Sequence, residues 1–318
     1  DDYQMDMSDV HGQEQAKRAL EIAAAGAHNI LLSGPPGSGK TLLARTMPSI
    51  LPGMTEDEII EVTKIYSIAG LLGKAKPMIT TRPFRSPHHT SSGVSLVGGG
   101  RVPKPGEISL AHRGILFLDE LPEFPRQVLE NLRQPIEDGV ISISRAQGTL
   151  NYPARFTLIA SQNPCPCGYY SDPDKNCICT PSQVIKYQNK ISGPILDRID
   201  IHIEVPRINF DKLQNTEKNE SSESIRQRVE KVRQIQNDRF INTETKYNSE
   251  MRPQEIKKFC QLDNTSTELL KSAVDQMHLS ARAYHRILKI ARTIADIDNA
   301  KHLQTKHVAE ALQFRSKQ

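Results

Sequence analysis

A glycine-rich loop that ends in a lysine and a threonine is the part of this sequence best suited to chemistry. It reads, in order, Gly34, Pro35, Pro36, Gly37, Ser38, Gly39, Lys40 and Thr41. The order glycine, four residues, glycine, lysine, serine or threonine is typical of loops that cradle nucleotide phosphates, because glycines let backbone amides turn toward phosphate oxygens. Lys40 would add a full positive charge and Thr41 would hold Mg²⁺. The loop predicts bound ATP and magnesium; a plain glycine-rich turn is the alternative.

The segments on either side of this loop have the character that a phosphate-binding loop requires. Residues 29–33 form an apolar run typical of a short buried strand, and a helical pattern starts at Leu42. Another helical pattern precedes the strand and follows Val10, Gly12 and Gln13. A helix in that position can cover the adenine. We therefore expect Val10, Gly12, Gln13 and Leu42 to join the loop in lining the nucleotide site.

A second apolar run, 115–118, ends in the carboxylates Asp119 and Glu120. Four apolar residues in a row are typical of a strand that is buried on both faces, as in a parallel sheet. Such sheets bind ligands at the carboxyl ends of their strands, so Asp119 can reach the magnesium held by Thr41 while Glu120 polarises the attacking water. A pair of acids that caps the next helix is the alternative interpretation.

Asn163 follows a third strand pattern, 156–161, and is expected at the same edge of the sheet. Its side-chain amide can orient a water molecule near the outermost phosphate. The alternative is an Asx-type turn that precedes Pro164.

Four of the five cysteines lie close together in the sequence, directly after Asn163. Cys165 and Cys167 form one pair, and Cys177 and Cys179 form the other. In a chain that we expect to be cytoplasmic, two such pairs favour a structural zinc over disulfides. The pairs lack the usual spacing of two intervening residues, so free thiols and a redox pair remain open. Cys260 stands apart and is expected to be a small core residue.

Length and composition indicate an α/β protein with a second, smaller domain. The chain has 318 residues, of which 37% are apolar and 25% charged, with a formal net charge of +4. The charge permits nucleic-acid binding without requiring it. There is no run of eighteen apolar residues and no secretion signal, so a cytoplasmic protein is expected, and the start at Asp1 suggests a fragment of something longer. We predict a P-loop nucleotide-binding domain with a parallel sheet over 1–210, a polar linker over 211–222 and an all-α lid domain over 223–318.

The remaining periodic segments predict further elements. The predicted helices cover 8–25, 56–67 and 126–136, with Thr55 and Glu58 as a capping box, and four more with apolar stripes at 225–235, 269–277, 280–294 and beyond Thr305. The runs 140–145 and 150–153 predict a β-hairpin, and the alternation in 201–205 predicts the last strand of the sheet.

Two features leave alternatives open. His88 and His89 lie in a loop-rich stretch and could bind a metal, although paired loop histidines more often form hydrogen bonds. Arg282 lies in the first turn of a predicted helix, where a cation opposes the helix dipole unless an anion is near. A phosphate would be such an anion; an arginine that points to water is the alternative.

Several runs together resemble the AAA+ ATPases, and among them the magnesium-chelatase-like branch that includes the ComM/YifB competence-related proteins. The runs that carry the resemblance are Phe84-Arg85-Ser86-Pro87-His88-His89-Thr90, Gly98-Gly99-Gly100, Pro105-Gly106-Glu107-Ile108-Ser109-Leu110-Ala111-His112, Asp119-Glu120 and Asn163-Pro164-Cys165-Pro166-Cys167-Gly168. The resemblance extends over nearly the whole chain. Family members carry a Lon-protease-like domain ahead of this region; nothing like it precedes Asp1, and we expect no protease activity.

The resemblance implies roles for residues that the spacing alone does not assign. It places the sensor-one function on Asn163, an arginine finger that acts on the neighbouring subunit on Arg198, and the sensor-two function on Arg282. It also implies a ring, expected to be a hexamer, with ATP at the subunit interfaces, and a DNA helicase that drives branch migration during recombination in natural transformation.

For DNA, the expected contacts are Arg101, Lys104 and Arg145, because the glycine-rich segment and the hairpin that carry them would project from the sheet; solvated loop tips are the alternative. Two other functions compete with a helicase: a metal-insertion motor subunit of the chelatase type, and a chaperone that remodels protein partners. No membrane partner is expected.

Overall fold

The fold was analysed in a computed structural model that describes residues 5–73, 77–100, 103–145, 148–170, 172–207 and 219–315, with only the backbone described at 144, 145 and 148. Five parallel strands form the central sheet in the order β2-β5-β8-β1-β9. Their bounds are Phe84–Arg85 (β2), Ile115–Leu118 (β5), Thr157–Gln162 (β8), Ile30–Ser33 (β1) and Ile201–Glu204 (β9). Ile30 is in register with Ile159 on one side and with Ile201 on the other.

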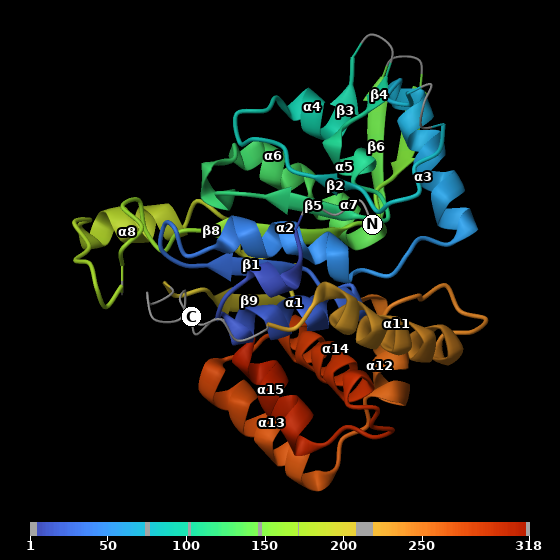
Figure 1. The fold of residues 1–318 in the computed structure, drawn as a ribbon. Helices are drawn as coiled ribbons and strands as arrows, with labels where there is room; N and C mark the ends of the chain where they lie inside the picture. The colour runs from blue at the N-terminus through green and yellow to red at the C-terminus, as the bar shows by residue number, and fades with distance from the viewer. Residues whose placement is uncertain are drawn as a thin grey trace.

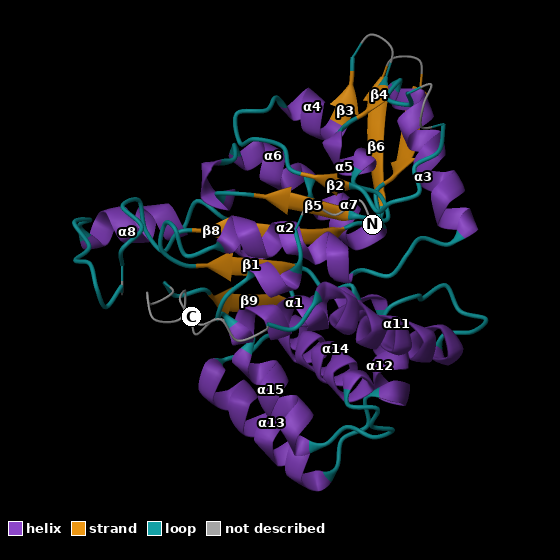
Figure 2. Ribbon diagram, in the orientation of Figure 1, coloured by secondary structure: helices purple, strands orange, loops and turns teal. Residues whose placement is uncertain are grey.

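Alternate residues of the strands enter two different cores. Ile30, Ile159 and Ile201 face a core built with helices of the amino- and carboxyl-terminal parts, whereas Leu116 and Leu158 face a second core with the middle of the chain. Because successive side chains of a strand point to opposite faces, the continuous apolar runs in the sequence are those of strands covered on both sides. The predicted parallel sheet is confirmed (Figures 1 and 2).

Helices cover both faces of the sheet. The first part of the chain contributes η1 (Met7–Asp9), α1 (Glu14–Gly26), α2 (Lys40–Ile50) and α3 (Glu56–Ala69). The middle contributes α4 (Gly93–Val97), α5 (Glu107–Leu110), η2 (Leu121–Glu123), α6 (Arg126–Asn131), α7 (Arg133–Asp138), α8 (Pro181–Gln188) and α9 (Gly193–Leu196). The last part contributes α11 (Ser222–Arg239), η3 (Asn248–Glu250), α12 (Pro253–Phe259), α13 (Asn264–Met277), α14 (Ala281–Ile297) and α15 (Thr305–Gln313). No helix in these described ranges is long and apolar enough to cross a membrane.

Local sequence explains where several helices begin and end. The predicted capping box is present at α3, where the Thr55 hydroxyl accepts from Glu58 N and the Glu58 carboxylate accepts from Thr55 N. One predicted helix, 126–136, is in fact two short helices that meet at Leu132. Pro135 explains the break, since proline lacks the N–H that a continuing helix needs but fits the first turn of a new one.

The start of α1 also differs from the prediction of a helix over 8–25. Gly12 and Gln13 both have positive φ, 64° and 58°, so the chain turns there and α1 begins only at Glu14. Pro48 lies inside α2, which continues to Ile50. The left-handed conformations of Gly12 and Gln13 bring the Gln13 side chain toward the phosphate loop.

Two small antiparallel hairpins extend from the sheet side that faces away from the terminal helices (Figure 2). The first consists of β3 (Gly98–Gly99) and β4 (Lys104–Pro105), and the second of β6 (Val140–Arg145) and β7 (Gly148–Pro153). The predicted hairpin is therefore confirmed, with a second strand that starts at Gly148 instead of Leu150. The two hairpins are joined by a hydrogen bond of 2.9 Å from the Tyr152 hydroxyl to Pro103 O.

The carboxyl-terminal helices share a core with the nucleotide-binding part. Helix α11 packs against α1 and α2, and α14 packs against α1. Met7 N donates to Ser222 Oγ at 2.7 Å, which ties the amino terminus to the start of α11. Most of the predicted linker, 211–222, lies outside the described residues, and its last two residues cap and begin α11.

Candidate functional site

The phosphate loop connects β1 to α2 at the carboxyl edge of the sheet. Gly37 and Gly39 have φ of 76° and 90°, which residues with a Cβ seldom adopt. At Gly34 a Cβ would lie 2.2 Å from Val205 O, so only glycine permits the close approach to the chain after β9. Gly39 is the N-cap of α2 and offers no side-chain acceptor, which leaves the first amides of the helix free to bind an anion.

Two polar side chains of the loop, Ser38 and Lys40, have no negatively charged partner among the described residues. Ser38 Oγ is buried and has no hydrogen-bond partner among the described residues. Lys40 Nζ donates to Gly34 O at 2.7 Å, Pro35 O at 2.8 Å and Asn163 Oδ1 at 3.2 Å. Burial lowers the pKa of Lys40 to about 8, against the opposing effect of Asp119 and Glu120. A polyphosphate would give both groups the negatively charged partner that they lack, so the loop fits a nucleotide.

Asp119 lies at the end of β5, next to Thr41 at the start of α2. Thr41 Oγ1 donates to Asp119 Oδ2 at 3.0 Å, and Ser161 Oγ donates to Asp119 Oδ1 in a very short hydrogen bond. The hydroxyl of Thr41 and the carboxylate of Asp119 are the hard oxygen ligands that Mg²⁺ prefers. The donor set therefore fits the predicted magnesium site.

Glu120 adopts a left-handed backbone conformation with φ 54° and ψ 51°, which is uncommon for a residue other than glycine. Its backbone N donates to Asp119 Oδ1 and to Ser161 Oγ, both at 3.1 Å. These bonds hold the strained turn while the Glu120 side chain stays 52% exposed, with Oε2 3.7 Å from His89 Nδ1. Such strain at a charged, open position is typical of functional residues. The carboxylate can receive a proton from a water molecule beside the loop.

The two loop histidines form no metal-binding group with other described residues, since the cysteines below are the one cluster of three or more potential ligands there. His88 Nδ1 instead lies 2.8 Å from Thr90 Oγ1, and the His88 and His89 ring centroids are 4.1 Å apart.

The segment predicted to cover the adenine contacts the phosphate loop. Gln13 Nε2 donates to Pro206 O at 2.5 Å and to Ser38 O at 3.3 Å, so it bridges the loop and the chain after β9. Val10 is buried in the same core as α2, and Leu42 packs against that core. The structure thus brings most of the predicted nucleotide-lining residues together.

Arg198 and Arg282 do not join this group. Neither forms a hydrogen bond or ion pair with the phosphate loop of its own chain within the described ranges. Arg198 precedes β9 at the opposite edge of the sheet, where Nη2 contacts Glu137 Oε1 at 2.5 Å and Nη1 donates to Pro194 O at 2.5 Å. Its Nε is buried and has no partner among the residues described. Arg282 is exposed in the first turn of α14, whose N-cap is Ser280.

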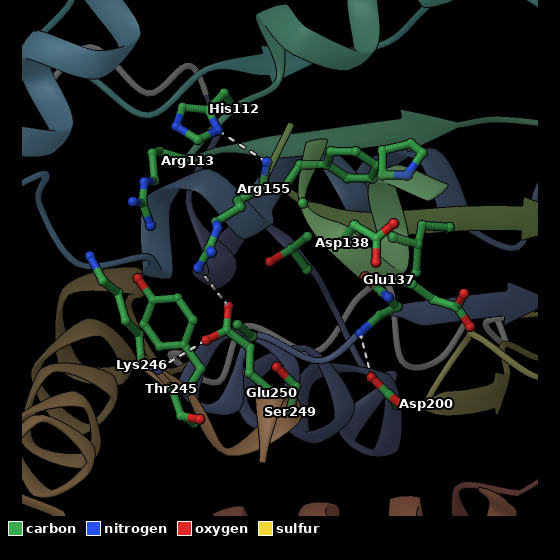
Figure 3. Close-up of a pocket in the computed structure, with 18 of the residues that line it drawn as sticks. His112, Arg113, Glu137, Asp138, Arg155, Asp200, Thr245, Lys246, Ser249 and Glu250 are labelled. Atoms are coloured by element: carbon green, nitrogen blue, oxygen red, sulfur yellow. Dashed lines mark hydrogen bonds and ion pairs between the residues drawn. The ribbon is translucent and has the colours of Figure 1, made fainter. Parts of the chain in front are cut away.

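Arg198 borders a cavity of about 1060 Å³ that is lined by charges of both signs (Figure 3). Sequence reasoning did not assign a role to the charged clusters in this cavity. Asp200 lies 3.3 Å from Arg286 Nε and 3.6 Å from His28 Nδ1, and it accepts from Asn29 N at 3.1 Å. Burial alone would raise the pKa of Asp200, but His28 and Arg286 lower it to about 2.

A second cluster in the cavity joins α3 to the start of β5. Glu61 Oε2 accepts from Arg113 Nε at 2.8 Å and lies 3.1 Å from His112 Nε2. Burial would raise the pKa of Glu61, but Arg113 and His112 lower it to about 2. His112 Nδ1 accepts from Arg155 N at 3.0 Å, so the proton of the neutral ring lies on Nε2. From the sequence, His112 could have drawn attention by its position shortly before a strand and as the last residue of a run that carries the family resemblance.

The four predicted cysteines form one cluster. Their sulfur atoms all lie within 4.8 Å of one another, and Cys165 is fully buried. Cys165 Sγ is 3.4 Å from Cys167 Sγ and 3.7 Å from Cys177 Sγ. Cys260 is buried, as predicted, in the core that the sheet forms with the helices of the amino- and carboxyl-terminal parts.

Of the predicted DNA contacts, Lys104 is exposed on β4. Arg145 ends β6, where only its backbone is described, and Arg101 lies outside the described residues.

The parallel sheet, the phosphate loop and the paired Thr41 and Asp119 define the class as a P-loop ATPase of the AAA+ type. Residues 6–213 match the family model of the magnesium chelatase subunit ChlI, and residues 219–315 match the model of its C-terminal part. The chain therefore belongs to the magnesium chelatase ChlI family.

Similar proteins show which members of this family the chain resembles. The chain is 48% identical over 98% of its length to "Competence protein ComM" of Haemophilus influenzae, and 46% identical over 98% to the uncharacterised protein YifB of Escherichia coli. It spans 60% and 61% of those two proteins. The magnesium-chelatase 38 kDa subunit of Cereibacter sphaeroides is more distant, at 25% identity over 49% of this chain and 52% of the subunit. The predicted ComM/YifB-type family is confirmed.

Proposed function

We propose that this chain is the ATP-hydrolysing part of a ring-shaped motor that acts on DNA. The observation that carries the proposal is the group of Lys40, Thr41, Asp119, Glu120 and Asn163 at the carboxyl edge of the sheet. Phosphoryl transfer needs little more from a protein than positioned charges and a positioned water molecule. These five side chains are of the types, and in the places, that such a reaction requires.

Each residue has a distinct role in the proposal. Lys40 and the free amides of α2 bind the outer phosphates, and Asn163, already bonded to Lys40, orients the attacking water. Glu120 accepts the proton of that water. Thr41 and Asp119 would hold Mg²⁺, which neutralises charge on the phosphates when bound.

Two observations support a ring in which neighbouring subunits complete each site. Arg198 lies at the sheet edge opposite its own phosphate loop, with Nε buried and unpaired among the described residues. A guanidinium that reaches a γ-phosphate from a neighbour would provide the remaining transition-state charge. We propose the same geometry for Arg282, which is exposed and has no ion pair within the described ranges. A hexamer is the ring size that we propose.

The case for DNA rests on the relatives and on two hairpins. The similar protein of Haemophilus influenzae is named a competence protein, and competence concerns the uptake of DNA. Lys104 is exposed on the first hairpin and Arg145 ends a strand of the second. We propose that these residues and Arg101 contact DNA in the ring, and that the motor drives branch migration in recombination during natural transformation.

We further propose that the cysteine cluster binds zinc. Zinc–sulfur bonds are about 2.3 Å in tetrahedral sites, which separates the sulfur atoms by roughly 3.8 Å. Three of the sulfur–sulfur distances in the cluster are 3.4, 3.6 and 3.7 Å. The cluster is therefore close to the size of a four-cysteine zinc site.

The test of the DNA motor is the ATPase rate with and without branched DNA, at several salt concentrations, with Lys40→Ala as the inactive control. We expect DNA to raise the rate, and the stimulation to fall as salt rises, because phosphate contacts release counterions. A rate that no DNA changes at any salt concentration would count against a DNA motor. It would favour a metal-insertion motor, which the distant chelatase subunit supports, or a protein-remodelling motor.

A further inference from the structure

The cysteine cluster is directly connected to the nucleotide site. Asn163, whose Oδ1 accepts from Lys40 Nζ at 3.2 Å, is separated from Cys165 by one residue. In Figure 1 this part of the chain leaves the end of β8 and leads to α8, which projects beyond the carboxyl edge of the sheet. A force that holds Cys165 in place therefore also holds the backbone of Asn163.

The geometry of the cluster favours a metal over a disulfide. A disulfide requires sulfur atoms about 2.05 Å apart, whereas the distances here are 3.4 Å and longer. Backbone amides of Gly168 and Tyr170 donate to Cys165 Sγ at 3.2 and 3.3 Å. These two N–H donors fix the position of the Cys165 sulfur within the cluster.

The segment around the cluster has almost no apolar core of its own. Among the described residues from 165 to 180, Cys165 is the one apolar side chain that is buried. Ile178, between two of the cysteines, is 85% exposed. Small units that cannot bury enough apolar surface need a disulfide or a metal to hold their shape. A metal at the four cysteines would supply that constraint.

The same segment packs against the phosphate loop. Gly168 has φ of 85°, and a Cβ added there would lie 2.4 Å from Pro36 Cδ. Pro36 follows Pro35, whose carbonyl accepts from Lys40 Nζ. The turn from Cys165 to Gly168 is closed by a hydrogen bond of 3.0 Å from Gly168 N to Cys165 O, so cluster and loop share one rigid contact.

A second contact reaches the other side of the loop. The Arg207 guanidinium stacks over the Tyr169 ring at 5.1 Å and lies 3.6 Å from Asp172. Arg207 follows Pro206, whose carbonyl accepts from Gln13 Nε2, the side chain that also bonds Ser38 O. The cysteine segment therefore contacts both walls of the nucleotide site.

We propose that a zinc-type ion on Cys165, Cys167, Cys177 and Cys179 braces the phosphate loop and Asn163, so that ATP turnover depends on the metal. This inference rests on the proposed ATPase function. Without the metal, Asn163 loses its fixed position relative to Lys40, and a misplacement of about 1 Å at a reacting group can slow a reaction by about a hundredfold. Loss of the metal would then switch the motor off.

The experiment compares the protein with its metal, after chelation and transfer into magnesium buffer, and after zinc is added back. Metal content, affinity for a non-hydrolysable ATP analogue, and kcat are measured in each state. We expect about one zinc per chain, a fall in kcat of about tenfold or more on removal, weaker analogue binding, and recovery with zinc. Folded, metal-free protein with unchanged kcat and affinity would overturn the proposal, as would protein that takes up no metal.

Three variants separate the brace from a general effect on folding. Cys177→Ser removes one ligand, so we expect loss of metal and a slow rate that zinc does not restore. Gly168→Ala keeps all four sulfurs but strains the contact with Pro36, so we expect retained zinc with slower hydrolysis; retained zinc with a normal rate would contradict the brace. Cys260→Ser, in the distant core, is the matched thiol control and should keep both metal and rate.

The same measurements distinguish this inference from the proposed function. Metal-loaded wild-type protein that hydrolyses no ATP would contradict the ATPase itself. In that event, affinity for the analogue still tests the brace: affinity that falls on metal removal supports it, and affinity that stays constant overturns it.

Discussion

The two edges of the central sheet are built on opposite electrostatic principles. At the carboxyl edge, Ser38 Oγ is buried without a partner in the described structure, and burial lowers the pKa of Lys40 to about 8. At the amino edge, Asp200 and Glu61 are paired with arginine and histidine, and those partners lower both carboxyl pKa values to about 2 despite burial. At the first edge Lys40 has no carboxylate partner among the described residues, whereas at the second edge Asp200 and Glu61 each pair with an arginine.

The difference shows which charged residues to associate with function. An ion pair in which both charges have their partner within the protein mainly holds elements together. Arg286 and Asp200, for example, hold α14 against β9. A buried polar group that lacks a partner needs something from outside the chain. By that criterion Arg198 draws attention at the amino edge, since its Nε is unpaired among the described residues although its other nitrogens are bonded. His28 Nδ1 and the Nε and Nη1 of Arg233 are buried and have no hydrogen-bond partner there as well.

The largest expected effect comes from Arg198, which lies at the amino edge but has a buried, unpaired Nε among the described residues. Fingers that stabilise the γ-phosphate contribute roughly 10³ to 10⁵ in rate, so Arg198→Ala should lose about that much ATPase activity. Arg155→Ala, on the same edge and half exposed, is the matched arginine control.

A mixing experiment tests whether Arg198 acts on a neighbour. Arg198→Ala chains mixed with Lys40→Ala chains should regain some activity, because some interfaces pair an intact loop with an intact finger. Mixtures shown to co-assemble that remain inactive would refute a role across the interface.

Glu120 should give the next largest effect. Glu120→Gln keeps the shape of the side chain but removes the base, so we expect ATP affinity close to normal and a kcat lower by about 10² to 10⁴. Lys40→Ala should instead lose nucleotide binding, since it removes the charge on the outer phosphates. Glu123→Gln, one turn along and bonded to Lys190, is the control. Normal hydrolysis by Glu120→Gln would show that another group activates the water.

Much of the carboxyl edge could be predicted from the sequence because its determinants are local. Strand, glycine loop and helix follow one another within 30–50, and Asp119 and Asn163 each come directly after a strand. The carboxyl ends of parallel strands meet at one edge, so Asp119 and Asn163 could be placed beside Lys40 without knowing the strand order. The strained backbone of Glu120 could not be predicted, since it depends on the hydrogen bond from its N–H to Ser161.

The amino edge could not be predicted because its pairs join residues far apart in the sequence. Asp200 and Arg286 are 86 positions apart, and nothing in the local pattern of either marks the other. Long-range contacts elsewhere in the molecule could not be predicted either.

Arg85 and Glu107, both in runs that carry the family resemblance, form a bidentate ion pair with two hydrogen bonds of 2.6 Å. The contact between Gly168 and Pro36 also could not be predicted from the sequence, because it depends on how the cysteine segment folds back.

The proposed DNA contacts should give a smaller effect, confined to binding. Replacing Arg101, Lys104 and Arg145 together by Ala should reduce the slope of log affinity against log salt by about 0.9 for each duplex phosphate that the protein no longer neutralises. Basal ATPase activity should persist, because the carboxyl edge is unchanged. The control replaces three exposed cations of the carboxyl-terminal part: Lys257 in α12, Lys271 in α13, and Lys301 between α14 and α15. An unchanged slope in the first variant would move the DNA path elsewhere on the ring.

The smallest expected effect concerns His112 at the amino edge and the pH dependence of stability. Burial lowers the pKa of His112 to about 4, and its Nδ1 is held as an acceptor by Arg155 N, so the folded protein resists protonation of this ring. The unfolded chain protonates near pH 6.5, so stability falls as pH drops from about 6.5 toward 4. The lowered carboxyl pKa values of Asp200 and Glu61 contribute stability that is lost as pH falls from their ordinary values of 3.8 and 4.5 toward about 2.

His112→Gln tests this prediction, because its amide can accept from Arg155 N and donate to Glu61 without titrating. Between pH 7 and pH 5 the wild type should lose about 2 kcal/mol more unfolding free energy than this variant, from about 1.5 pH units at about 1.36 kcal/mol each. His202, whose pKa burial also lowers to about 4, contributes the same slope to both proteins and cancels. Urea midpoints at the two pH values measure the difference, with His302→Gln as the exposed control. Equal losses of unfolding free energy in wild type and His112→Gln would mean that His112 is already protonated in the folded protein. The contacts at the amino edge would then not hold this ring neutral.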